Sequence, residues 1–390
     1  MLKIRAYAVG GQGRLRGRRA SVPMAICLLL MVAIRSAWCG PYREAGVNGY
    51  IDPRTWRHAD PLSPGAVVNP IFRGWATEVV EYVPSDPTWS GVWNDPAQAL
   101  GPATGQNFDI VSLGELTLQE IAQGVPPGSI TLAFGDSEEP AGGAVIRNGA
   151  GYDFVVFENG MMSQITTALG SLEGQLLAEL AYVEVSSNGR DFARFPSISL
   201  TPGRTGSYGT IETSDIHNLA GKHPNAYGVC TGTPFDLDEL VNHPDVTAGK
   251  VDLAAIRYVR IVDVPGSGDF TDDAVQQVAP GTGPAWAPYA ESHPIYDQWP
   301  TWGSGGFDLE AVGILHEQPY VADINLDGAV DYGDLSLWTA AWRSQFGEER
   351  WNHRCDLARP ANRSVDLHDF AVFAAQWRQV ERWRAEFMDE

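Results

Sequence analysis

The chain has 390 residues, of which 48 are Asp or Glu and 27 are Lys or Arg, giving a formal net charge of −21. This length allows one large domain, or two, together with a small additional module. The acidic balance repels phosphate backbones, so we expect no nucleic acid partner.

The first 39 residues differ in charge from the rest of the chain. They carry seven basic side chains and no acidic one. An apolar run at residues 22–34 follows, and its 13 residues are too few to span a bilayer but suit a signal-peptide core. Ala37 and Cys39 fit the small-residue positions of a cleavage site. We therefore expect residues 1–39 to be a signal peptide and the mature protein to be secreted, extracellular or held at the cell surface.

Two other interpretations of the leader stay open. Arg18 and Arg19 fit a twin-arginine export signal, and Cys39 fits a lipidation site. Without the leader, 20 Lys and Arg face 48 Asp and Glu, a formal charge of −28. No membrane span is expected after the leader is removed. Cys230 and Cys355 are then the remaining cysteines, too few for a disulfide framework, so we expect two free thiols or one weak bridge.

Residues 40–318 are predicted to form a β-sandwich or jelly-roll domain. Short apolar segments are separated by Gly- and Pro-rich turns, and a strand–helix alternation is missing from the pattern. Asn188 and Gly189 predict a type I′ hairpin turn. Residues 175–180 are expected to form a short helix, and residues 201–250 and 265–303 long loops. The expected strands are residues 129–134, 152–157, 181–185, 192–195, 256–264 and 307–315.

The pattern changes near Pro319, where an internal repeat begins. The segment AVDYGDLSLWTAAW at residues 329–342 aligns with SVDLHDFAVFAAQW at residues 364–377, with five identities in fourteen positions and a separation of 35 residues. Residues 319–380 are therefore predicted to be a separate module, and residues 381–390 a helical or frayed tail.

The segment DINLDGAVDYGD, residues 323–334, has the spacing of a calcium-binding EF-hand loop. Gly328 permits the sharp turn at position 6, and Ala329 offers its carbonyl at position 7. Carboxylates this close together repel one another without a cation. The side chains predicted to bind Ca2+ are Asp323, Asn325, Asp327, Asp331 and Asp334.

The second loop departs from this spacing. A strict count back from Asp369 puts Ala358 and Pro360 at ligand positions and Arg363 at the glycine position. A two-residue insertion would instead make Asp356 the first ligand, and an empty, merely structural loop is the other alternative. With the insertion the ligands are Asp356, Asn362, Ser364 through its carbonyl, Asp366 and Asp369.

These features resemble a dockerin module, in which each of two calcium loops is followed by one helix. Asp at position 12 agrees with the resemblance, as does the lack of a helix before each loop. The resemblance implies Ca2+ as cofactor and a cohesin-like or other cell-surface protein as partner. One apolar stripe is predicted on each helix, comprising Leu335, Trp338 and Trp342 on the first, and Phe370, Phe373 and Trp377 on the second.

Most of residues 95–316 resemble the galactose-binding-like jelly-roll domains of bacterial cell-surface proteins. The segments that carry the resemblance are residues 151–160, 180–192 and 296–315. It implies a fold but supplies no activity. Asp153, Glu158 and Asp308 stand on apolar strands and form a candidate second metal site; hydrogen bonds to backbone amides, or to Arg257 and Arg260, are the alternative.

Aromatic residues in the predicted loops suggest a carbohydrate ligand, because flat rings stack on sugar faces; packing in the core is the alternative. The candidate residues are Trp89, Trp93, Trp286, Trp299 and Trp302.

Catalytic motifs are missing from the sequence. It has no GxSxG, HExxH, P-loop or GxGxxG signature, and we interpret His217 and His223 as solvated loop residues in preference to a metal pair. We therefore favour a non-catalytic surface protein that docks through calcium and binds polysaccharide. The alternative is a polysaccharide-degrading glycoside hydrolase that carries a dockerin, whose two carboxylates the sequence does not single out.

Overall fold

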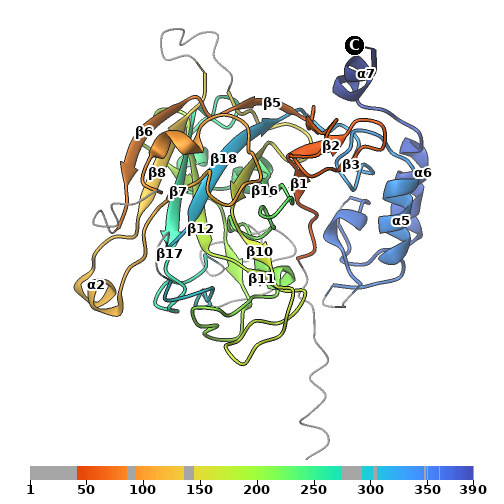
Figure 1. Ribbon diagram of the computed structural model, residues 1–390. Coiled ribbons are helices and arrows are strands. Elements are labelled where there is room, and N and C mark those ends of the chain that lie inside the picture. The colour runs from red at the N-terminus through yellow and green to blue at the C-terminus, as the bar shows by residue number, and fades with distance from the viewer. Residues whose placement is uncertain are drawn as a thin grey trace, which may run out of the picture. The chain divides into compact units, whose positions relative to one another are not determined.

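The computed structural model describes residues 42–85, 93–135, 145–273, 292–301, 305–346, 348, 350–359 and 361–389 (Figure 1). The chain divides into two compact units, Met1–Trp38 and Cys39–Glu390, and the described residues all belong to the second. The expected signal peptide lies outside them, as do Trp89, Trp286 and Trp302. No helix among the described residues is both long and apolar enough to cross a bilayer.

Two antiparallel sheets make the protein mainly β. Within the described residues, the first sheet has six strands, in the order β1-β16-β9-β18-β5 with β7 paired to β18. Its strands are β1 (Val47–Asn48), β5 (Phe72–Trp75), β7 (Val111–Ser112), β9 (Phe154–Glu158), β16 (Thr231–Phe235) and β18 (Asp308–Leu315). The second sheet has the order β13-β12-β17-β8-β6. Its strands are β6 (Glu78–Val83), β8 (Ser129–Ala133), β12 (Leu180–Ser186), β13 (Ala193–Arg194) and β17 (Tyr258–Val264).

Smaller elements connect these sheets. Short strand pairings have the orders β3-β2-β4, β10-β11 and β14-β15. Their strands are β2 (Tyr50–Asp52), β3 (Arg57–His58), β4 (Val67–Val68), β10 (Met161–Met162), β11 (Leu176–Leu177), β14 (Ile198–Ser199) and β15 (Ile216–His217). The helices of this part are η1 (Pro96–Ala99), α2 (Leu118–Gln123), η2 (Thr213–Asp215), η3 (Leu237–Leu240) and α3 (Pro244–Thr247).

The two large sheets contribute side chains to one hydrophobic core. All residues of β9, β12 and β18 are buried, as their near-continuous apolar sequences predict for strands covered on both faces. β6 is an edge strand and is largely exposed, with Glu78 and Glu81 at its surface. The shared core includes Phe154, Val156 and Val312 from the first sheet and Leu132, Val183 and Ile261 from the second.

Three local expectations were wrong. Residues 175–180 are extended, because Leu176 and Leu177 pair with β10. The turn between β12 and β13 is not type I′: Gly189 has φ +74° but Asn188 is not in the left-handed region. The Asn188 Oδ1 atom instead accepts hydrogen bonds from the amides of Arg190 and Asp191, at 2.8 and 2.9 Å. The predicted loop 201–250 contains β16, whose Gly232 and Pro234 hide a strand signal.

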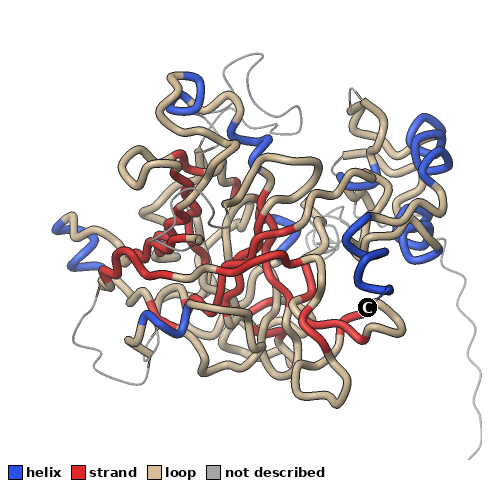
Figure 2. The backbone as a smooth tube through the Cα atoms, turned by 90° about the horizontal axis from the view of Figure 1, so that it is seen from above, coloured by secondary structure: helices blue, strands red, loops and turns tan. Residues whose placement is uncertain are grey.

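The C-terminal residues have a core of their own. The helices α5 (Tyr332–Ala340) and α6 (Leu367–Gln376) lie side by side (Figures 1 and 2), with η4 (His353–Cys355) between them in sequence. The Trp338 ring lies 5.3 Å from the Phe370 ring and 6.1 Å from the Phe373 ring, centroid to centroid. The two predicted apolar stripes therefore pack against each other. Cys355 is buried in this core, and it and Cys230 are free thiols.

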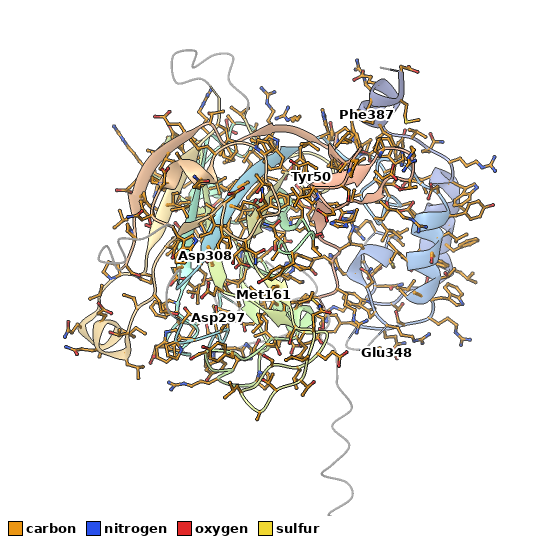
Figure 3. The ribbon with its side chains drawn as sticks, in the orientation of Figure 1. Tyr50, Met161, Asp297, Asp308, Glu348 and Phe387 are labelled. Carbon is orange, nitrogen blue, oxygen red and sulfur yellow. The ribbon has the colours of Figure 1, made fainter. Side chains whose placement is uncertain are left out.

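The expected tail contains a helix, α7 (Arg382–Asp389). Its Trp383 is buried and stacks on His316 at 6.0 Å, next to Trp56 at 6.1 Å. Phe387, labelled in Figure 3, meets the edge of the Trp56 ring at 5.5 Å. The end of the chain thus packs on the β-rich part, away from the core of α5 and α6.

Candidate functional site

The loop 323–334 is organised by hydrogen bonds from its own backbone. Asp323 accepts bonds from the amides of Asp327 and Gly328, at 3.1 and 2.9 Å. Gly328 has φ +80°, the left-handed turn that glycine makes without strain. At the end of the loop, Asp331 is the N-cap of α5, and Asp334 accepts the Asp331 amide at 2.8 Å in a capping box. The loop therefore closes on itself and starts the helix.

Negative charge is concentrated and buried in this loop. Asp323 and Asp334 are both 0% exposed. Burial, together with the carboxylates of Asp334, Glu381 and Asp327, raises the pKa of Asp323 well above its usual value. Burial also raises the pKa of Asp334 to about 6, although the hydrogen bonds that this carboxylate accepts from backbone amides lower its pKa. The carboxylates are thus held closer together than their charges favour.

The second loop has the geometry of the two-residue insertion. Asp356 accepts a bond from the amide of Arg363 at 2.8 Å, as Asp323 does from Gly328. Arg363 has φ +63° in the place of that glycine. Asp366 is the N-cap of α6 and Asp369 completes a second capping box. Asp356 therefore takes in the second loop the place that Asp323 takes in the first.

The second loop is the more exposed. Asn362 is exposed, and its Oδ1 accepts bonds from the backbone amide and the hydroxyl of Ser364, both at 2.8 Å. The Asp366 side chain is 37% exposed and bonds to His368. In this loop water would compete with a cation for the exposed oxygen atoms, so the loop offers a cation weaker ligands than the first loop does.

The two loop–helix units, the loop 323–334 with α5 and the second loop with α6, are related by an internal pseudo-twofold axis that follows the 35-residue repeat. The segment after α5 pairs with the second loop, where the Arg343 amide bonds the Val365 carbonyl at 3.0 Å. The segment after α6 pairs with the first loop, where the Arg378 amide bonds the Val330 carbonyl at 2.9 Å. Arg343 and Arg378 share left-handed φ values of +61° and +66°. Each loop is thus held by the chain that leaves the other unit's helix.

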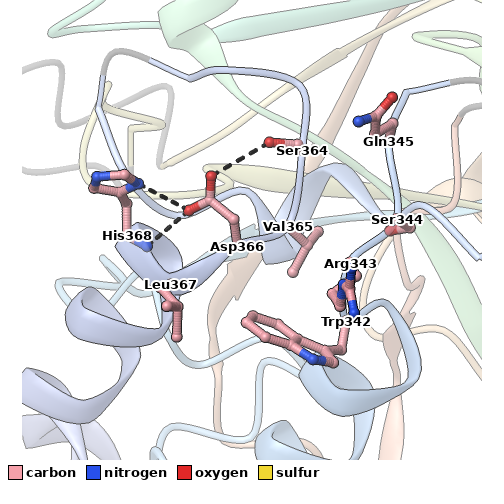
Figure 4. Close-up of a pocket in the computed structure, with 9 residues that line it drawn as sticks. All are labelled: Trp342, Arg343, Ser344, Gln345, Ser364, Val365, Asp366, Leu367 and His368. Carbon is pink, nitrogen blue, oxygen red and sulfur yellow. Dashed lines mark hydrogen bonds and ion pairs between the residues drawn. The ribbon is translucent and has the colours of Figure 1, made fainter.

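Equivalent surface grooves accompany this symmetry. One groove, drawn in Figure 4, is lined by Trp342, Arg343, Ser344, Gln345, Ser364, Val365, Asp366, Leu367 and His368. The corresponding groove of the other unit is lined by Ala329, Val330, Asp331, Arg378, Gln379 and Val380, and also by Trp56, Arg384 and Met388. The second groove is therefore partly covered by α7 and by the turn that holds Trp56, and the first is not.

The donors of the first loop fit a hard divalent cation. Carboxylates, the Asn325 amide oxygen and the Ala329 carbonyl are the oxygen ligands that calcium takes. Among the described residues, no group of three or more His, Cys, Asp or Glu side chains is preformed to hold a metal ion. Asp331 and Asp334 also serve as helix caps, so these two side chains have a structural role of their own.

The three carboxylates predicted as a second metal site do not meet. Asp153 and Glu158 lie at opposite ends of β9, roughly 16 Å apart at 3.3 Å per residue. Asp153 accepts the amides of Gly149 and Leu237, at 2.9 and 2.7 Å, as the hydrogen-bonding alternative predicts. Arg260 pairs with Glu184 on β12 and not with Asp153, Glu158 or Asp308, because Arg260 and Glu184 lie opposite each other in the β12–β17 register.

Glu158 and Asp308 instead belong to a larger group of buried carboxylates. Burial and Asp308 raise the pKa of Glu158 well above its usual value, and burial and Asp263 raise the pKa of Glu115 to about 9. Burial also raises the pKa of Asp263 to about 7. Two of these acids, Asp297 and Asp308, are labelled in Figure 3. We call the following set the acid cluster: Glu115, Glu158, Glu179, Asp263, Asp297 and Asp308.

Sequence reasoning singled out Glu158 and Asp308 of this cluster and missed Glu115, Glu179 and Asp297. The six residues come from six separate places in the chain, and none of these places has a recognisable ligand spacing. The Glu115 Oε1 and Asp263 Oδ2 atoms are buried and have no hydrogen-bond partner among the described residues. Asp297 accepts the Leu180 amide at 2.7 Å, and Asp263 accepts the Phe307 amide at 2.8 Å. Backbone amides therefore satisfy part of the cluster, and one oxygen each of Glu115 and Asp263 stays without a hydrogen bond among the described residues.

The candidate sugar-binding aromatics differ in exposure. Trp299 is buried, and its indole N–H donates to the Leu116 carbonyl at 3.2 Å, so its ring serves the core. Trp93 is half-buried and stacks at 6.4 Å on Phe108, which is 70% exposed. Trp93 and Phe108 thus form an aromatic surface, and Phe108 was not predicted.

The interpretation of His217 as a solvated loop residue was wrong. His217 is buried and lies 3.1 Å from Glu239 and 3.4 Å from Glu44. Burial alone would lower its pKa, but these two carboxylates raise the pKa of His217 to about 9. Glu44 also pairs with the buried Lys222 and lies 3.8 Å from His353 of η4. His217, Glu239, Glu44 and Lys222 form a buried ion-pair network in the β-rich part. His353 lies beside it, and burial lowers the pKa of His353 to about 3.

Comparisons of the chain with protein-family models, with curated proteins and with solved structures found no match.

Proposed function

We propose that the protein is an exported, non-catalytic protein of the cell surface. In this proposal residues 319–380 are a dockerin-like module that binds Ca2+, and residues 40–318 are a jelly-roll domain. The observation that supports the proposal is the pair of loop–helix units. In each unit a buried aspartate accepts backbone amides of its own turn. A second aspartate, three residues after the N-cap, completes the capping box of the helix.

The buried charge of the first loop supports Ca2+ as the ligand. A divalent cation neutralises carboxylates that otherwise repel one another in a low-dielectric environment. The ligands would be Asp323, Asn325, Asp327, Asp331 and Asp334, with the carbonyl of Ala329. The second loop would bind more weakly, because Asn362 and Asp366 are exposed and Arg363 adds a positive charge.

Exposed apolar side chains on the two helices support a docking role. Tyr332 and Leu367 are 72% and 71% exposed, and Phe370 is 42% exposed. Apolar side chains clustered on a surface mark interaction sites, and we infer a cohesin-like or other cell-surface protein as the partner. The aromatic surface of Trp93 and Phe108 is the place where a polysaccharide would stack on the β-rich domain.

Calcium is expected to stabilise the full chain against heat. An ion that binds only the folded protein adds about 2.7 kcal/mol when its concentration is 100 times Kd. Isothermal titration calorimetry and thermal melting, each in CaCl2 and in excess chelator, measure the effect, with MgCl2 as the control for ionic strength. Absence of both binding heat and a melting shift would remove the calcium proposal.

The second candidate function is a glycoside hydrolase that carries the module. The acid cluster favours it, because a raised carboxyl pKa is what a general acid requires. Incubation of the chain with a panel of polysaccharides, followed by a reducing-end assay, separates the two. Hydrolysis that is lost in Glu115→Gln would replace the non-catalytic proposal, whereas binding without hydrolysis supports it.

A further inference from the structure

Glu381 is a buried carboxylate beside the first loop that the EF-hand spacing does not include. It is 1% exposed, and its amide donates to the Gly328 carbonyl at 2.8 Å. Its Oε2 atom accepts the indole N–H of Trp383. Its Oε1 atom is buried and lacks a hydrogen bond of ordinary geometry among the described residues, although the backbone amide of Tyr320 is close enough to lower the pKa of the carboxyl. Glu381 interacts electrostatically with Asp323 and Asp327 and with the guanidinium of Arg354, so its carboxylate stands in the field of the loop.

Arg384, one turn into α7, contacts the same loop. Its Nη1 atom donates to the Asp327 carbonyl at 2.8 Å and forms an ion pair with the Asp327 carboxylate. The guanidinium lies 4.1 Å from the centroid of the Trp56 ring. Both partners of the ion pair are only 13% exposed, so water screens it weakly. Arg384 thus places a positive charge on a residue that occupies a ligand position.

The second unit lacks this arrangement. The pseudo-twofold relates Glu381 to Phe346, because both amides bond to the carbonyl of the turn residue, Gly328 or Arg363. The Arg363 guanidinium lies 5.4 Å from the centroid of the Phe346 ring. An acid beside the first loop and an aromatic ring beside the second therefore distinguish two otherwise equivalent sites.

We propose that Glu381 and Arg384 belong to the cation site of the loop 323–334, Glu381 as an additional carboxylate and Arg384 as a tethered competitor for Asp327. The inference rests on the proposed calcium function and deepens it. Glu381 strengthens the attraction for a hard divalent cation. Arg384 neutralises the Asp327 carboxylate when the cation is absent, and the guanidinium repels the cation when the cation binds. Because α7 packs on the β-rich part through Trp383, cation binding and the docking of α7 are thermodynamically linked.

Calorimetric titration of the full chain with CaCl2 tests the proposal with matched variants. Glu381→Gln is expected to raise the Kd of the tighter site roughly tenfold, and Arg384→Gln to lower it roughly threefold, because each removes one charge near the ion. Glu386→Gln and Arg382→Gln are the controls, since these two residues form an ion pair on the same helix with side chains 64% and 91% exposed. The controls are expected to change Kd less than roughly twofold.

The outcomes separate the inference from the proposed function. No binding heat in the wild type overturns the calcium function itself. Binding in the wild type with equal Kd values for Glu381→Gln and Glu386→Gln overturns the role of Glu381. Gln keeps an acceptor for the Trp383 indole, and melting in chelator checks that the variant folds. Should it not fold, the Arg384→Gln and Arg382→Gln pair decides, and equal Kd values there overturn the proposal.

Discussion

Asp323→Ala is expected to abolish the calcium-dependent stabilisation of the chain, whereas Asp356→Ala leaves most of it. Asp323 is fully buried, and its two oxygens accept the amides that form the turn at Gly328. Its loss removes a proposed calcium ligand and leaves the Gly328 amide without its acceptor, whereas the Asp327 amide keeps a bond to Asn325 Oδ1 at 3.1 Å. Asp356 anchors a loop in which Asn362 is exposed and the Asp366 side chain is 37% exposed, so a cation there is expected to contribute less.

The measurement is the difference in melting temperature between CaCl2 and excess chelator for each variant. We expect this difference to fall to zero in Asp323→Ala and to keep more than half of its wild-type value in Asp356→Ala. Both variants are also compared in chelator alone, because loss of a buried hydrogen-bond acceptor costs about 1 to 3 kcal/mol without any metal. Equal calcium responses in the two variants would show that the first loop is not the tighter site.

In the absence of divalent cations, the free energy of unfolding is expected to fall as pH rises from 5 to 8. The pKa of Glu115 is raised to about 9 and that of Asp263 to about 7, so the folded protein holds protons that the unfolded chain has lost. A raised carboxyl pKa gives stability that is complete below the unfolded value, near 4, and is lost as pH rises through the folded value. One such proton costs about 1.4 kcal/mol per pH unit, and so on the order of 4 kcal/mol over this range.

Glu115→Gln provides the test, since glutamine imitates the protonated acid. The variant is expected to lose stability less steeply than the wild type between pH 5 and 8, in urea titrations with chelator present. Glu173→Gln is the control, because Glu173 is exposed and its substitution removes the same formal charge. A slope in Glu115→Gln equal to that of the wild type would contradict a shared proton at Glu115 and Asp263.

The same experiment distinguishes a proton from a metal in the acid cluster. The Asp323→Ala background removes the loop that we propose as the tighter calcium site. Any calcium effect at pH 8 that remains in this background and disappears when Asp308→Asn is added is expected to belong to the acid cluster. A calcium effect that is present in Asp323→Ala and absent when Asp308→Asn is added would support Glu158 and Asp308 as members of a second cation site. Its absence would leave the cluster as carboxyl groups held by protons and backbone amides.

The sequence alone determined those features that depend on neighbours in the chain. The period-two and continuous apolar runs gave most of β8, β9, β12, β17 and β18, because burial of a strand dictates its side chains directly. The 35-residue repeat gave both loop–helix units and the stripes on α5 and α6, because turn and capping residues act over a few positions. The strand β16 was not predicted, because Gly232 and Pro234 have a weak propensity for strands and its pairing between β1 and β9 overrides that propensity.

Only the tertiary structure decided which charged groups meet. The acid cluster joins segments as distant as Glu115 and Asp308, and Arg384 reaches Asp327 across 57 residues. Asp153 and Glu158 look like companions in the sequence but are separated by the length of β9, because a strand extends its residues along a line. Electrostatic contacts depend on distance in space, and the folding of the sheets sets that distance, so local spacing determines the loops while packing determines their charged surroundings.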